Sequence, residues 1–261
     1  MVAVAAAPPR WRPEDRAERA SLRSVVRADR ALALVPLSLA IGRFLAVAGM
    51  RGYRYVDSAE YGTVDLTGRS RRPWATPLLY ALVDHDPVRE VRVQALVGVV
   101  AWTFLAWAAA AWFPKGPARL VVAGSLAALG LTTSVTNWDA AILSESLAIS
   151  LTVALLAAWL ELARRRTPGA AVAVGLVTDP WLFVRQSLLP TAALVALAAA
   201  VAAVATWTRH GRWRVVAGLA VGLVLLTGLA AASYDRNQEV VRTNLAVIIV
   251  GDDPASHLYV R

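Results

Sequence analysis

Apolar residues gather in long runs along this chain, and short segments rich in arginine, proline and acidic residues separate the runs. A helix needs roughly 20 apolar residues to cross a bilayer core about 30 Å thick. By this measure we expect spans at 31–50, 93–112, 118–135, 140–160, 169–185, 188–207 and 215–232. The pattern predicts an all-α fold, a polytopic transmembrane helical bundle of about seven spans within residues 31–232.

The fifth run, 169–185, differs from the others because Asp179 and Pro180 interrupt it. Proline removes a backbone donor from a helix interior. Irregular backbone survives at membrane depth only where protein buries it or water reaches it. We therefore expect a short or broken helix here. If this run crosses the membrane, the C-terminal tail lies outside, and if it does not, the tail lies inside.

Polar segments flank and connect the runs. Residues 1–30 form a basic tail, and residues 233–261 form a polar tail that reads as the start of a region continuing elsewhere. A long polar loop, 51–90, follows the first run. Its short apolar stretch, 74–83, is too brief to cross a bilayer, so we expect an interfacial helix there.

The composition narrows the class of protein. Apolar residues make up 57% of the chain and charged residues 17%, against roughly a quarter charged in soluble domains. This excludes a disordered chain and an ordinary soluble enzyme. The absence of cysteine excludes disulfides, thiol catalysis and cysteine-bound metals. The net charge of +9 comes from arginines placed between apolar runs, so it indicates membrane orientation rather than a nucleic-acid partner.

Basic residues concentrate on the cytoplasmic side of membrane proteins, and this rule gives an orientation in the cell membrane. Residues 1–30 then lie in the cytoplasm, together with the basic residues around 115–119, 164–166 and 209–214. Loops 51–90, 136–139 and 179–187 fall outside, as does the tail. Loop 51–90 carries several arginines and conflicts in part, but long loops count less in this rule.

The outer loops collect the residues best suited to chemistry. They are Asp57, Glu60, Tyr61, Asn137, Asp139, Glu145, Asp179 and Arg185. A carboxylate there can act as a general base towards an acceptor hydroxyl. An arginine can hold lipid phosphate oxygens through charge-assisted hydrogen bonds.

Each of these residues also has a purely structural interpretation. Asp57 can be a solvated loop acid, and Asp139 can cap the fourth span, because acids favour helix N-termini. Glu145 lies inside a run, where ionisable side chains usually face the bundle interior, and Arg185 can snorkel to headgroups. Arg43, within the first run, either snorkels outward or pairs with an acid.

Three motifs occur in order along the chain. Asp57-Ser58-Ala59-Glu60-Tyr61 follows the first span, Arg-Arg-Pro-Trp-Ala-Thr-Pro occupies 71–77, and Asn-Trp-Asp-Ala-Ala-Ile-Leu-Ser-Glu-Ser-Leu occupies 137–147. Together they resemble the GT-C superfamily, the multi-spanning glycosyltransferases that use polyprenyl-phosphate sugar donors. The resemblance covers roughly residues 31–250. Ser58 stands where the family commonly has glutamate, and the few spans imply a truncated, split or minimal bacterial member.

The resemblance implies an inverting transfer of a sugar to an envelope glycan, lipid or protein acceptor on the outer face, among membrane lipids. Asp57 would deprotonate the acceptor hydroxyl, Asp139 would position donor or acceptor, and Arg185 would hold the donor phosphate. The implied catalytic set is Asp57, Glu60 and Asp139, and the implied substrate-binding set is Tyr61, Asn137, Glu145 and Arg185. Beyond the donor substrate no cofactor is implied, and a divalent metal at these acids stays open.

A non-catalytic integral membrane protein is the alternative. It would be a partner subunit, a lipid transporter, or a degenerate or truncated transferase. A transporter typically has internal repeats and paired broken helices, and the sequence shows one broken segment and no clear repeat.

Overall fold

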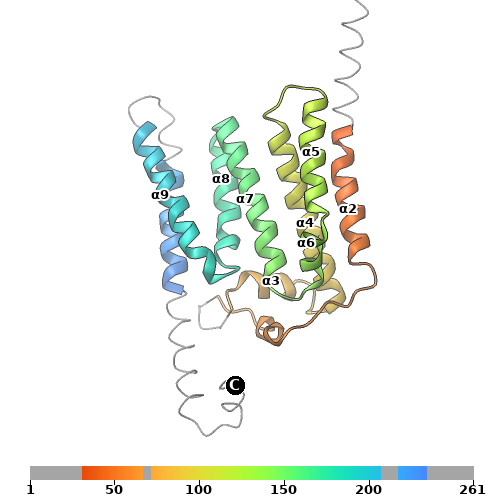
Figure 1. Ribbon diagram of the computed structural model, residues 1–261. Coiled ribbons are helices and arrows are strands. Elements are labelled where there is room, and N and C mark those ends of the chain that lie inside the picture. Colours follow the sequence, from red (N-terminus) through yellow and green to blue (C-terminus); the bar gives the residue numbers. More distant parts are fainter. Residues whose placement is uncertain (1–30, 67–71, 207–216, 234–261) are drawn as a thin grey trace, which may run out of the picture.

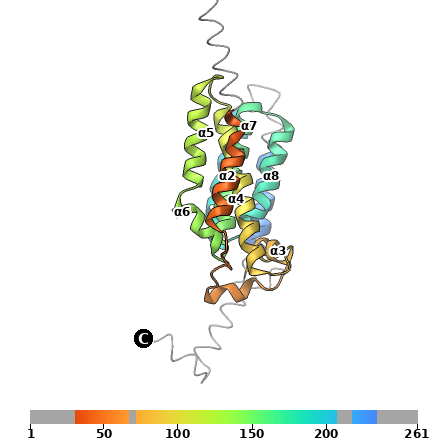
Figure 2. The same ribbon diagram turned by 90° about the vertical axis from the view of Figure 1, so that its right-hand side faces the viewer.

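The computed structural model describes residues 31–66, 72–206 and 217–233, and within these ranges the chain is built from helices. The helices stand in a broad row (Figure 1) that Figure 2 shows from its narrow edge. These ranges contain no β-strand, only an isolated bridge between Tyr53 and Ala141. The predicted tail 1–30 and all but the first residue of the predicted tail 233–261 lie outside the described residues, as do 67–71 and 207–216.

The described ranges contain longer helices and several short elements that connect them. The longer helices are α2 (Leu34–Ala46), α4 (Pro87–Ala110), α5 (Pro117–Gly130), α7 (Glu145–Arg165), α8 (Pro168–Leu182), α9 (Leu189–Thr206) and a helix at Ala217–Ser233. The short elements are η1 (Val56–Tyr61), α3 (Ala75–Ala81), α6 (Thr133–Thr136), η2 (Asn137–Ala140) and η3 (Gln186–Leu188). The longer helices run alternately up and down the bundle, so that successive connections lie at opposite ends (Figure 1).

Two helices in the described ranges are long and apolar enough to cross a membrane, namely α4 with 24 residues and α7 with 21. A third candidate is α5 together with Thr133–Ala140, a pair bent by 51°. The helix α2, the stretch Leu189–Val201 of α9 and Ala217–Ser233 are apolar but shorter. The fold is therefore all-helical with two or three candidate spans, fewer than the seven predicted from the apolar runs.

The start of α4 shows why helix bounds and apolar runs differ. The carboxylate of Asp86 accepts hydrogen bonds from the backbone N–H groups of Val88 and Arg89, both at 2.9 Å, and Pro87 occupies the first helical position. An N-cap acceptor satisfies amides that the helix leaves free, and proline suits the first position because it has no N–H. Capping therefore starts α4 well before the apolar run at residue 93.

The fifth run forms a short helix, as expected. The helix α8 has 15 residues and includes Pro180 near its end. The indole N–H of Trp181 donates to the hydroxyl of Thr152 on α7 at 2.8 Å, which ties the end of α8 to its neighbour. The apolar stretch at 74–83 forms α3, which packs against α8 through the rings of Trp74 and Phe183, 5.4 Å apart.

The two largest apolar core clusters of the described residues share α7. One joins α2, α4, α5 and α7, and the other joins α7, α8, α9 and Ala217–Ser233. Representative members of the first are Leu39, Trp102, Ala123 and Val153. Representative members of the second are Leu155, Val174, Ala196 and Leu223. Many residues between the helices are alanine. In membrane proteins small side chains let helices approach closely, because the hydrophobic effect does not drive helices together in lipid. Helix α7 therefore holds the two halves of the bundle together.

Candidate functional site

The loops that carry the predicted residues gather at one end of the bundle. The elements η1, α3 and η2, the start of α7 and the end of α8 all lie at that end (Figure 1). The basic turns between α4 and α5 and between α7 and α8 lie at the opposite end. The bundle thus separates an acidic-loop end from an end with short basic turns, in the grouping that the sequence predicted.

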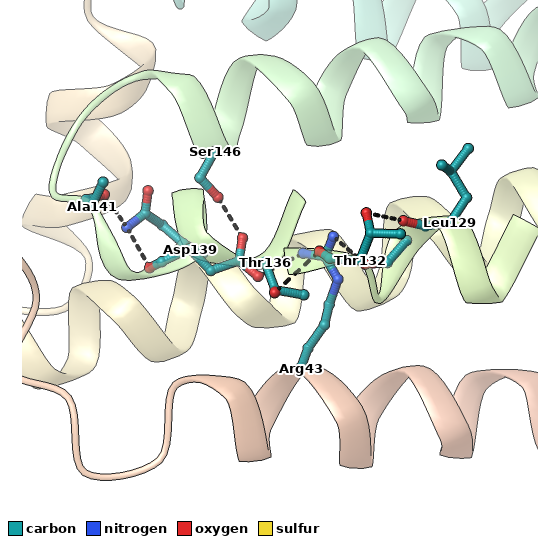
Figure 3. Close-up of polar contacts among 9 residues, drawn as sticks. Arg43, Leu129, Thr132, Thr136, Asp139, Ala141 and Ser146 are labelled. Carbon is teal, nitrogen blue, oxygen red and sulfur yellow. Dashed lines mark hydrogen bonds and ion pairs between the residues drawn. The ribbon is translucent and has the colours of Figure 1, made fainter. Parts of the chain in front are cut away.

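A fully buried ion pair joins Arg43 of α2 to Asp139 of η2. Their Nη1 and Oδ2 atoms lie 2.7 Å apart, and the two side chains are 1% and 2% exposed. Nη2 of Arg43 donates to the carbonyl of Gly130 at 3.1 Å, and the Ser146 hydroxyl donates to the other carboxylate oxygen of Asp139 at 2.7 Å (Figure 3). Of the two alternatives for Arg43, the structure therefore shows pairing with an acid.

Gly98 of α4 makes room for this pair. A Cβ atom built on Gly98 would lie 1.8 Å from Nη1 of Arg43 and 2.6 Å from its Cζ. Real Cβ atoms essentially never approach another atom so closely. The guanidinium cannot move aside without breaking its bonds to Asp139 and Gly130. Glycine at 98 is therefore the residue that lets the pair sit between α2 and α4.

The predicted positioning role of Asp139 stays a prediction, because both of its carboxylate oxygens are engaged inside the protein. Its contacts reach α2 and α7, and its backbone carbonyl accepts from Gln94 of α4 at 3.2 Å. In this arrangement Asp139 joins three helices at the acidic-loop end. Asn137, two residues earlier, starts η2 and is exposed.

A second cluster lies on η1 and is open to solvent. Asp57 and Glu60 are three residues apart, and residues at this spacing eclipse one another in a 3₁₀ helix, so both carboxylates lie on one face. Arg72 bridges them: its Nη2 lies 2.6 Å from Oδ2 of Asp57 and its Nε lies 2.6 Å from Oε2 of Glu60. The Asp57 side chain is 57% exposed. This end of the molecule therefore presents a carboxylate that solutes can reach.

Tyr61 forms the floor of this cluster. Its ring is buried beneath Arg72, whose guanidinium carbon lies 5.3 Å from the ring centroid, and its edge packs against Tyr80 of α3. Burial by itself lowers the pKa of Arg72, but Tyr61, Asp57 and Glu60 raise it, and the net pKa lies above the ordinary value. Arg72 therefore keeps its charge. The sequence marked it only as part of the 71–77 motif, and its partners were not predicted.

Ser58 fastens η1 to the loop before α7. Its hydroxyl donates to the carbonyl of Ile142 and accepts from the N–H of Tyr55, both at 2.8 Å. Beside it, the N–H of Tyr53 donates to the carbonyl of Ala140 at 2.7 Å, and the N–H of Ile142 donates to the carbonyl of Tyr53 at 3.0 Å. Two loops far apart in sequence are thus held together by side-chain and backbone bonds.

A third ion pair joins Glu145 and Arg185, two of the predicted substrate-binding residues. Nη1 of Arg185, just after α8, lies 2.9 Å from Oε1 of Glu145 in the first turn of α7. The second oxygen of Glu145 is buried and has no hydrogen-bond partner. Arg185 is 42% exposed, so its guanidinium remains accessible to an anion. The structure brings these two residues together, which the sequence did not predict.

The described residues contain no candidate metal site. Within residues 31–66, 72–206 and 217–233, no three His, Asp or Glu side chains form a group that could hold a metal ion.

Comparisons of the chain with protein-family models, with curated proteins and with solved structures give no significant match. A function for this protein must therefore be inferred from the residues at the acidic-loop end.

Proposed function

We propose that this protein is a membrane glycosyltransferase of GT-C type that moves a sugar from a polyprenyl-phosphate donor to an envelope acceptor. One observation carries the proposal: an exposed carboxylate, Asp57, is held by Arg72 at the bundle end that also presents the Glu145–Arg185 pair. A general base and a cation for a phosphate leaving group are the two functions that this transfer needs.

The proposed reaction is a single inverting displacement. Asp57 takes the proton of the acceptor hydroxyl, the acceptor oxygen bonds to the anomeric carbon, and the bond from that carbon to the phosphate oxygen breaks. The polyprenyl phosphate leaves with the electron pair, and Arg185 holds its charge. In this scheme Glu60 and Arg72 position Asp57, Asn137 belongs to the acceptor side, and Asp139, bound to Arg43 and Ser146, positions the loop that carries Asn137.

The proposal includes a topology. We propose that α2, α8, α9 and Ala217–Ser233 cross the membrane together with α4, α7 and the bent pair of α5 with Thr133–Ala140, which gives about seven spans. Their alternating directions in one row support this number (Figure 1). The end with the short basic turns would face the cytoplasm and the acidic-loop end the outer surface, following the basic-residue rule for short loops.

Asp57→Asn tests the base. Membranes containing the full chain would receive radiolabelled polyprenyl-phosphate sugars, and the label transferred to the acceptor would be measured. We expect Asp57→Asn to lower the transfer rate by about 10²- to 10⁴-fold, the usual contribution of a general base. Asp84→Asn is the matched control, because Asp84 is also an exposed acid paired with an arginine, at 2.9 Å from Arg89. It should transfer at the wild-type rate.

Unchanged transfer by Asp57→Asn would remove the proposed base. The absence of transfer by the wild-type chain with every donor would favour the alternative of a non-catalytic partner subunit. That alternative has its own support, because Arg72 already engages the carboxylates of both Asp57 and Glu60.

A further inference from the structure

Two arginines at the acidic-loop end stand apart from the ion pairs described above. Arg51 follows α2, Arg92 lies in the second turn of α4, and both residues are exposed. Neither forms an ion pair with an acid in the part of the chain that the structure describes. By contrast, Arg72 and Arg89 of the same loop are paired. A guanidinium keeps its charge in proteins, so Arg51 and Arg92 are cations that a ligand can reach.

The acids around these two arginines are engaged elsewhere. An arginine or backbone amides hold the carboxylates of Asp57, Glu60, Asp84 and Asp86. At longer range Arg92 attracts Asp86, but that carboxylate accepts its hydrogen bonds from the first amides of α4. The arrangement therefore leaves Arg51 and Arg92 for an external anion.

The two arginines belong to adjoining segments. Val47 and Val91 are members of one buried apolar cluster, so the chain after α2 packs on the start of α4. A Cβ atom built on Gly52 would lie 3.0 Å from Cγ2 of Val91. Arg51 and Arg92 are the sequence neighbours of these two touching residues. Two cations from segments far apart in the sequence thus flank one contact.

An exposed apolar stripe on α4 begins at Arg92. Leu96 and Val100 follow it at intervals of four residues and are 50% and 62% exposed. Residues four apart lie on the same face of a helix. Arg92 therefore stands at the acidic-loop end of an apolar surface that no part of the described chain covers.

The chain around Arg51 has the same order of features. Ile41 and Leu45, also four residues apart, are exposed on α2, which ends shortly before Arg51. Tyr53 and Tyr55 follow Arg51, and both rings are exposed. Tyrosine rings favour the headgroup level of a bilayer. An apolar stripe, a cation and aromatic rings thus succeed one another towards the end of the bundle.

This order of features selects among anions. A soluble phosphate would pair with the arginines but leave the apolar stripes in contact with water. An apolar helix of another protein would cover the stripes but leave the two cations without an anion. A phospholipid supplies both parts, because its acyl chains lie along the stripes and its phosphate accepts hydrogen bonds from guanidinium groups.

We propose that Arg51 and Arg92 hold the phosphate of an anionic phospholipid whose acyl chains lie along the exposed faces of α2 and α4. The inference rests on the proposed topology, which places these helices in the membrane, and it does not depend on the transfer reaction. It also gives Arg51 a partner on the outer side, where the basic-residue rule expects few arginines.

Photocrosslinking tests the site at its own position. The full chain in vesicles of dioleoylphosphatidylcholine would receive a trace of phosphatidylglycerol, or of phosphatidylcholine, that carries a diazirine on an upper acyl carbon. Mass spectrometry would measure the cross-links to α2 and α4. Cross-links to Ala217–Ser233, at the other edge of the row (Figure 1), normalise the yield. We expect phosphatidylglycerol to exceed phosphatidylcholine at α2 and α4.

Matched variants assign this preference to the two arginines. We expect Arg51→Gln and Arg92→Gln each to lower the phosphatidylglycerol yield about fivefold, the usual effect of one basic residue at an anionic membrane surface. The double variant should fall to the phosphatidylcholine level, and the corresponding double lysine variant should keep most of the yield. Arg89→Gln is the control, because Arg89 lies on the same turns of α4 but is paired with Asp84. It should cross-link as the wild type does.

Unlabelled competitors identify the source of the phosphate. Phosphatidylglycerol should displace the labelled lipid, and glycerol phosphate, which has no acyl chain, should not. Stronger displacement by a polyprenyl phosphate than by phosphatidylglycerol would assign the arginines to the sugar donor and overturn the proposal. Displacement by glycerol phosphate at equal concentration would overturn it as well.

The remaining outcomes separate this proposal from the proposed function. Equal yields from the two labelled lipids overturn it, and so does an unchanged preference in the double glutamine variant. A preference that is lost in that variant, with circular dichroism showing it folded, and kept in Arg89→Gln and Asp57→Asn supports it, even if no sugar transfer is detected. Sugar transfer without any lipid preference would leave the proposed function standing and remove this inference.

Discussion

Two arginine–carboxylate pairs with almost the same geometry lie at different depths in this molecule. Arg43 and Asp139 are 2.7 Å apart and 1–2% exposed, whereas Arg72 and Asp57 are 2.6 Å apart and 27% and 57% exposed. The first pair is closed on every side by α2, α4, α5, η2 and α7. The second lies on a loop helix and faces solvent.

The difference teaches that burial, rather than distance, decides what an ion pair can do. Removing one partner of a buried pair leaves an uncompensated charge and costs about 3–5 kcal/mol. An exposed pair contributes only about 0–1 kcal/mol, so its members exchange partners easily. The Arg43–Asp139 pair therefore suits architecture, and the Arg72–Asp57 pair suits chemistry.

The largest expected effect is on stability, from Arg43→Met. It leaves Asp139 buried without its cation, so we expect the free energy of unfolding to fall by about 3–5 kcal/mol. Unfolding in mixed micelles, followed by circular dichroism, would measure it. The double variant Arg43→Met with Asp139→Leu should recover much of the loss, because apolar replacement of a whole buried pair is often neutral. Wild-type stability of the single variant would show that the pair does not hold the helices together.

A smaller effect on stability and a clear one on transfer are expected from Arg72→Gln. Loss of this half-buried cation from a solvent-facing pair should change the free energy of unfolding by only about 1 kcal/mol. Transfer should fall by about 10²-fold, since a displaced reacting group costs roughly that factor. Arg72→Lys keeps the charge but not the two-pronged contact, so it should recover only part of the rate. A large loss of stability with unchanged transfer would reverse the roles assigned to the two pairs.

The smallest effect concerns a third carboxylate, Asp86, which uses backbone N–H groups instead of an arginine. Hydrogen bonds from the Arg89 and Val88 amides lower its pKa below the ordinary value. Because the folded pKa is depressed, its stabilisation is present above the unfolded value of about 3.9 and is lost as the pH falls through the folded pKa. Asp86→Ala should remove this pH dependence. Hydrogen exchange of the first turn of α4 at neutral and acidic pH measures it, and an unchanged pH dependence in Asp86→Ala would contradict the assignment.

The sequence predicts much of the helical architecture, because long apolar runs in a membrane protein rarely form anything other than helices. It predicts the number of spans and their limits less well. The predicted span started too late because the charged residues Arg89, Glu90 and Arg92 indicated a loop. In the structure the Asp86-Pro87 cap starts the helix at residue 87, before these charged residues. The bend of 51° after Gly130, where α5 ends, was also missed.

The candidate site was predicted in part. The motif marked Asp57 and Glu60, but the choice of Arg72 as their partner depends on a fold that brings residue 72 back to η1. Arg43 and Asp139 are 96 positions apart, and no local pattern connects them. Arg51 and Arg92 were not singled out at all, because their position beside one another depends on how the chain after α2 packs on α4.

Because Gly98 lies against Arg43, the effects of substitutions at positions 43 and 98 depend on each other. Any side chain at 98 collides with the guanidinium of Arg43, so alanine becomes tolerable there only after residue 43 has been shortened. The reverse order passes through an intermediate that cannot accommodate both residues. The effect of a change at either position thus depends on the residue present at the other, and variants selected for stability should change the two together or neither.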